Sequence, residues 1–223
     1  MRKRNEALKT KYKVQLGSAF SSKGQERHLA RMLQAVALMD KEKWEKAEKI
    51  LLQLKDKCTS LADTAAIYLL YGMSCEGRGN KEKAAGIYKE LLARDAQSTL
   101  GWTALGHLYQ RYGKPKEAVE CFQKALTYDA KNAFAACHMA TVLYGMRRYL
   151  EAIPTALQAL GNDPTLHKAA GVICLSYAAL GNEELAKKFF QIAVKAGADE
   201  KGLHANMVAH LHKPTGLNKR YFE

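Results

Sequence analysis

A spacing of 34 residues constrains this chain more than any other feature of its sequence. The clearest copy spans residues 99–132 and reads TLGWTALGHLYQRYGKPKEAVECFQKALTYDAKN. Its large apolar residues are Trp102, Leu105, Tyr109 and Phe122, and its small residues include Gly106, Ala118 and Ala125. Two antiparallel helices cross closely only where one side chain is small, and bulky neighbours one turn away then fill the remaining space. Because Gly113 separates the two blocks and suits the left-handed conformation that ends a helix, we predict a helical hairpin.

The same pattern recurs in phase along most of the chain. Units that start at residues 65, 99, 133 and 167 carry a small residue at position 20, namely Ala84, Ala118, Ala152 and Ala186. A weaker unit starts at residue 28, has Ala47 at position 20 and runs for 37 residues. We expect its long exit loop to end where Asp63 or Thr64 caps the next helix.

The order W-x2-L-G-x2-Y, then G, then A-x3-F-x2-A-L, resembles the tetratricopeptide repeat, a helix–turn–helix unit of 34 residues. The resemblance implies an all-α fold, a right-handed superhelical solenoid of such repeats. About five units are expected, at residues 28–64, 65–98, 99–132, 133–166 and 167–200. Residues 201–214 would form a C-terminal capping helix, because the last repeat has no neighbour to cover its apolar face.

Basic residues concentrate at the start of the chain. The formal net charge is +13, and residues 1–27 carry eight Lys or Arg against two Glu. This basic N-terminal extension either lies against the first repeat or acts as an arm that binds nucleic acid or an anionic surface. The tail at residues 215–223 is also basic and carries Tyr221 and Phe222 just before the final Glu223; these two aromatic side chains could dock into a groove.

The cysteines and the hydropathy pattern favour the cytoplasm. The five cysteines are odd in number and no pair has C-x-x-C spacing, which is typical of a reducing compartment. The basic start is not followed by an apolar run, so no signal peptide is expected. No stretch approaches 18 consecutive apolar residues, so no membrane span is expected either.

The sequence carries none of the motifs that indicate an enzyme. It has no phosphate loop, no dinucleotide-binding glycine pattern, no G-x-S-x-G and no H-E-x-x-H. His210 and His212 are two residues apart and diverge on a helix, so they cannot face one ion together. We therefore expect a non-catalytic protein without a cofactor or a metal.

In proteins of the tetratricopeptide family the first helices line a concave face, and the resemblance places positions 2, 5, 9 and 12 of each unit there. The candidate groove residues are taken from these positions, and Arg111 is added because it neighbours Gln110. They are Met39, Leu69, Met73, Thr103, His107, Gln110, Arg111, Phe134, Cys137, Tyr144 and Lys168. The resemblance implies a scaffold that binds a peptide or helix of a partner protein along this Met-rich apolar groove. The alternative is that a tightly wound superhelix, or the N-terminal segment, buries the same residues. Neither the partner nor the oligomeric state follows from the sequence.

Overall fold

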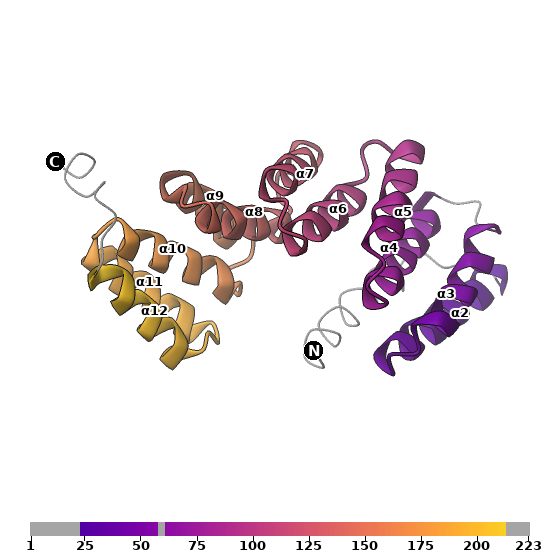
Figure 1. The fold of residues 1–223 in the computed structure, drawn as a ribbon, viewed down its shortest axis with the longest axis horizontal. Helices are drawn as coiled ribbons and strands as arrows, with labels where there is room; N and C mark the ends of the chain where they lie inside the picture. Colours follow the sequence, from indigo (N-terminus) through magenta and orange to yellow (C-terminus); the bar gives the residue numbers. More distant parts are fainter. Residues whose placement is uncertain (1–22, 58–60, 213–223) are drawn as a thin grey trace. The chain divides into compact units, whose positions relative to one another are not determined.

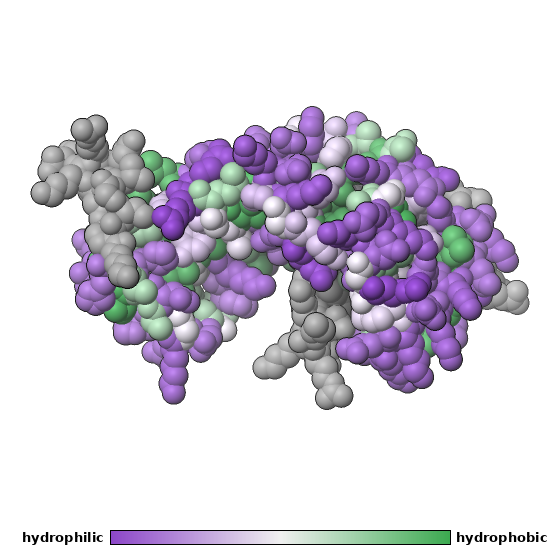
Figure 2. All heavy atoms as spheres, in the orientation of Figure 1, coloured by the Kyte–Doolittle hydropathy of each residue, from purple (hydrophilic) through white to green (hydrophobic). Residues whose placement is uncertain are grey.

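The computed structural model describes residues 23–57 and 61–212, which leaves the basic N-terminal residues 1–22 and the tail at 213–223 outside the described part. Within the described ranges the backbone forms α-helices and no strand (Figure 1). The all-α prediction is therefore confirmed. Figure 2 shows that the visible face of the described residues is mostly hydrophilic, with hydrophobic residues exposed in small patches.

Helices follow one another in antiparallel pairs. In chain order they are α2 (Lys23–Asp40), α3 (Trp44–Lys55), α4 (Leu61–Gly77), α5 (Lys81–Arg94), α6 (Thr99–Arg111), α7 (Pro115–Tyr128), α8 (Ala133–Gly145), α9 (Tyr149–Asn162), α10 (His167–Ala179), α11 (Glu183–Lys195) and α12 (Glu200–His212). Within pairs, α4 packs on α5, α8 on α9 and α10 on α11. Between pairs, the second helices α3, α7 and α9 pack on the first helix that follows each of them. This order of contacts is that of a helical repeat.

The chain divides into two compact units, residues 1–108 and 109–223. The boundary falls inside α6, so the last residues of that helix belong to the second unit. Each unit contains complete helical hairpins, such as α4 with α5 in the first and α8 with α9 in the second.

Small residues lie where the paired helices cross. The alanines at position 20 of the repeats are fully buried: Ala47, Ala84, Ala118, Ala152 and Ala186. In the first unit Gly72 faces the ring of Tyr88, and a Cβ atom added to Gly72 would lie 2.2 Å from Cε1 of that ring. The crossing of α4 and α5 therefore depends on the absence of a side chain at residue 72.

The turn between paired helices is built around a residue in the left-handed region. Gly113 has a φ of 71°, as its place in the sequence predicts. Gly79 and Gly181 hold the corresponding places in their hairpins, with φ of 80° and 77°. In the hairpin of α8 and α9 the place is taken by Arg147, with a φ of 60°. An L-residue other than glycine is strained there, at a cost of about 1–2 kcal/mol.

Side chains with short polar groups begin several of the helices. Asn80, Asn132 and Asn182 each accept a hydrogen bond from the backbone N–H three residues further on, which caps α5, α8 and α11. The expected cap at Asp63 or Thr64 is wrong, because α4 begins at Leu61 and both residues lie inside the helix. That helix extends about one turn further toward the N-terminus than the repeat spacing predicts.

Candidate functional site

The first helices of the second unit, α8 and α10, carry few charged residues. Helix α8 contains no Asp, Glu, Lys or Arg, and α10 contains only Lys168. Side chains that are partly or fully exposed on the two helices include Phe134, His138, Thr141, Tyr144, Lys168 and Leu175. Spacings of four and seven residues place Phe134, His138 and Thr141 on one side of α8. We call these six residues the first-helix face.

His138 connects the groups at the start of this face. Its Nδ1 lies 3.0 Å from Oε1 of Gln110, near the end of α6. Its ring lies 4.3 Å from the ring of Phe134 and 5.9 Å from that of Phe122, measured between centroids. His138 was not among the groove residues predicted from the sequence, although its spacing of four residues from Phe134 could have indicated it.

Tyr144 is paired with a residue of the last helix. Its hydroxyl oxygen lies 2.6 Å from Nε2 of His210 in α12, and the two rings meet edge to face. Burial raises the pKa of Tyr144 to about 12. Burial, with a smaller contribution from the charge of Arg147, lowers the pKa of His210 below its ordinary value. Both shifts favour the neutral forms, in which the hydroxyl donates to an unprotonated Nε2.

Arg147 provides a test of this end of the face. We expect Arg147→Gly to stabilise the fold by about 0.5–1 kcal/mol, because glycine adopts a positive φ without the steric cost. The same change should raise the pKa of His210, since it removes a nearby positive charge. Urea unfolding and an NMR titration of the His210 ring measure the two effects. Gly181→Ala in the next hairpin is the control and should destabilise the fold. An unchanged pKa of His210 in Arg147→Gly would contradict the proposed effect of the Arg147 charge on His210.

The structure divides the predicted groove residues into two groups. Four are buried in the cores of their units: Met39, Leu69, Thr103 and Cys137. Burial also raises the pKa of the Cys137 thiol. Seven are partly or fully exposed: Met73 and His107 in the first unit, and Gln110, Arg111, Phe134, Tyr144 and Lys168 in the second. The buried group packs the repeats together, whereas the side chains of the exposed group reach solvent.

The described residues hold no group of three or more His, Cys, Asp or Glu side chains that could bind a metal ion. Among the helices of residues 23–57 and 61–212, none is long and apolar enough to cross a membrane.

Part of the chain matches a known helical repeat. Two sequence profiles of the tetratricopeptide repeat match, one over residues 32–99 and the other over residues 100–132. The helical pairs continue beyond the matched residues in the same order, through α8 to α11. Residues 32–132 of the chain therefore contain tetratricopeptide repeats.

Among characterised proteins, the chain is similar to the type IV pilus assembly protein PilF of Pseudomonas aeruginosa, with 27% identity over 153 residues. That match covers 66% of this chain but only 59% of the length of PilF. Among solved structures, the crystal structure of MamA has a TM-score of 0.62 and 18% identity, covering 73% of this chain and 93% of that one. YrrB, described as a TPR protein with an unusual peptide-binding site, has a TM-score of 0.59 and 18% identity, covering 80% and 89%. At these identities the structural likeness concerns the fold.

Proposed function

We propose that this protein is a non-catalytic interaction scaffold whose first-helix face binds a peptide or a helix of a partner protein. One observation carries the proposal: α8 and α10 expose aromatic and aliphatic side chains, and their only charged residue is Lys168. Surfaces of this kind are typical of interaction sites, because a solvated helix face usually carries several charges. Peptide binding is described for YrrB, and the proposal extends it to this chain.

The chemistry of the face indicates what kind of segment it binds. Burial of apolar side chains of the partner against Phe134 and Leu175 supplies most of the binding free energy. Arg111 and Lys168, both exposed, orient carboxylate groups of the partner, and no acidic residue of α8 or α10 opposes them. Met73 and His107 are proposed as contacts of the first unit.

We also propose a cytoplasmic location. The cysteines of the described part, Cys75, Cys121, Cys137 and Cys174, are free and buried, which is consistent with a reducing compartment.

The proposal is tested by placing a charge in the middle of the face. Thr141 is partly exposed between Phe134 and Tyr144, and its hydroxyl donates to the carbonyl of Cys137 within α8. Thr141→Glu should reduce the amount of partner captured from native lysate by about tenfold or more, because burying an unpaired carboxylate against apolar groups is costly. Quantitative mass spectrometry of the captured proteins measures the loss, and circular dichroism and the melting temperature show whether the fold is kept.

Gln191→Glu is the matched control, because it adds the same charge on the exposed face of α11 and should leave capture unchanged. Equal capture by Thr141→Glu and the wild type would refute the role of this face. Capture that falls steeply with salt and is lost on deletion of residues 1–24 would instead favour the alternative, binding of nucleic acid or an anionic surface through the basic N-terminal segment.

A further inference from the structure

Helix α12 lies on the groove positions of the repeat before it. Figure 1 shows α12 beside α10 and α11, on which it packs. Met207 of α12 is buried in a cluster that includes Ala178, and Leu175 packs against this cluster. A Cβ atom built on Gly171 would lie 3.8 Å from Cδ1 of Leu203 in α12. Gly171, Leu175 and Ala178 are positions 5, 9 and 12 of their unit, so α12 covers the side of α10 that the repeat pattern assigns to a groove.

Helix α12 also reaches past α10 to the repeat before that. Nε2 of His210 lies 2.6 Å from the hydroxyl oxygen of Tyr144, which is position 12 of the unit that contains α8. In a regular array each repeat contacts only its neighbours, and this contact departs from that rule. Tyr144 and Leu175 both belong to the first-helix face. Part of the surface proposed to bind a partner is therefore already covered by a helix of the same chain.

Little burial holds α12 in this place. Met207 is the only buried residue of its 13, whereas α10, a first helix of the same length, buries nine. A helix of this length is marginal by itself in water, and Gly202 within it lowers its stability further. Segments with few buried apolar side chains open at a lower free energy than the whole fold. We therefore expect α12 to leave its place while α10 and α11 stay folded.

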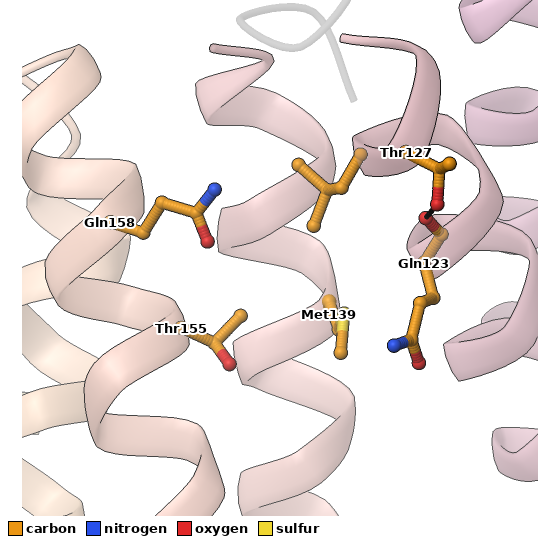
Figure 3. Close-up of a pocket in the computed structure, with 6 residues that line it drawn as sticks. Gln123, Thr127, Met139, Thr155 and Gln158 are labelled. Carbon is orange, nitrogen blue, oxygen red and sulfur yellow. Dashed lines mark hydrogen bonds between the residues drawn. The ribbon is translucent and has the colours of Figure 1, made fainter. Parts of the chain in front are cut away.

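A pocket of the same unit lies on another side of α8. It has a volume of about 260 Å³ between α7, α8 and α9, and it is lined by Gln123, Leu126, Thr127, Met139, Thr155 and Gln158. Figure 3 shows Met139 on the helix between the two that carry the labelled polar residues. Met139 and Tyr144 are five residues apart, which is roughly 140° around a helix. Release of α12 would therefore uncover a different side of α8 from the one that borders the pocket.

We propose that α12 is an internal ligand of the first-helix face, and that a helix of the partner displaces it in order to bind there. The inference rests on the proposed function and adds to it a means of regulation and the form of the partner. Leu203, Met207 and Leu211 recur at four-residue spacing, and His210 accepts the hydrogen bond of Tyr144. The displacing helix has apolar side chains at the same spacing and an acceptor for the Tyr144 hydroxyl.

A fluorescently labelled peptide of residues 199–212 tests whether α12 can be displaced. Its binding to the full-length protein is followed by anisotropy. The chain's own α12 is tethered at an effective concentration in the millimolar range, so it should exclude the peptide from the wild type. The variant Leu203→Glu/Met207→Glu places two carboxylates against the apolar cluster and leaves α8 and α10 unchanged. It should bind the peptide at least about tenfold more tightly than the wild type does.

His210→Ala tests the contact with Tyr144 alone. It removes the hydrogen bond from the chain's own helix but not from the peptide, so peptide binding should strengthen by about threefold or more. His212→Ala is the matched control, because it removes an exposed imidazole from the same helix and should leave binding unchanged. A peptide that carries Met207→Glu should bind to none of these proteins.

Hydrogen exchange distinguishes a displaceable ligand from the fixed cap that the repeat pattern predicts. In the double variant the amides of α12 should exchange rapidly, while those of α10 and α11 keep the protection of the wild type. Loss of protection in α10 and α11 would show that α12 is a structural cap and would overturn the proposal. Peptide binding that is equal in the wild type and the double variant, or absent from both, would also overturn it.

Partner capture separates this proposal from the proposed function. The double variant should capture at least about threefold more of the proteins that Thr141→Glu fails to capture. Equal or reduced capture would overturn the regulatory role of α12. Undiminished capture by Thr141→Glu would instead refute the proposed function, while the peptide would still report whether α12 can leave its place.

Discussion

Gly72→Ala should lower the free energy of unfolding by about 1–3 kcal/mol, although alanine is normally the better residue inside a helix. The added Cβ atom would lie 2.2 Å from Cε1 and 2.5 Å from Cζ of Tyr88. Tyr88 is fully buried, and its hydroxyl donates a hydrogen bond of 2.8 Å to the carboxylate of Glu76. The ring therefore cannot move away without breaking a buried hydrogen bond, and the two helices must separate instead.

Gly86→Ala is the matched control for this prediction. Gly86 lies in α5 of the same repeat and is exposed, and no neighbouring atom lies within 4 Å of the place where a Cβ atom would be. Gly86→Ala should therefore stabilise the folded protein by about 0.5–1 kcal/mol. Urea unfolding followed by circular dichroism measures both variants. In a Tyr88→Ala background the clash is absent, and Gly72→Ala should then become stabilising. Equal effects of Gly72→Ala and Gly86→Ala would show that the crossing tolerates a side chain.

Glu48→Gln should destabilise the first unit by about 2 kcal/mol at neutral pH. Glu48 is 8% exposed, between α3 and the next repeat, where it accepts hydrogen bonds from Arg78, at 2.8 Å, and from Lys83. Burial alone would raise the pKa of this carboxyl, but the hydrogen bonds and charges of Lys83 and Arg78 outweigh it and hold the pKa below its ordinary value. Replacing the carboxylate leaves both cations with a weaker, neutral partner.

The lowered pKa of Glu48 determines how its contribution to stability changes with pH. Glu48 ionises more readily in the folded protein than in the unfolded chain. Its contribution to the free energy of unfolding is therefore fully present above the ordinary pKa of about 4.5, and it is lost as the pH falls through the lower pKa of the folded state. The difference in melting temperature between the wild type and Glu48→Gln should therefore be largest near pH 7 and shrink in acid. Glu151→Gln removes an exposed ion pair with Arg148 and should change stability little. A difference that persists unchanged at pH 3 would contradict this account.

Much of the fold could be predicted from the sequence because its determinants are local. The contrast between large and small residues recurs every 34 residues, and helices pair wherever a small residue permits close approach. Gly113 takes the predicted left-handed conformation, and Pro115 begins α7 without costing a backbone hydrogen bond.

The candidate site could not be predicted in full from the sequence, because it includes contacts between residues far apart in the chain. Tyr144 meets His210 across 66 residues, and His138 meets Gln110 across 28, and neither pairing has a signature within one repeat. Helical spacing assigns a residue to a face, but the packing of neighbouring repeats decides whether that face is covered. For that reason Met39, Leu69, Thr103 and Cys137 are buried while Phe134, Tyr144 and Lys168 remain accessible. Side-chain size acts within one hairpin, so the repeat and its helix crossings follow from the amino-acid sequence. Burial of a side chain depends on the hairpins on either side, so the exposed residues could be identified only in the folded chain.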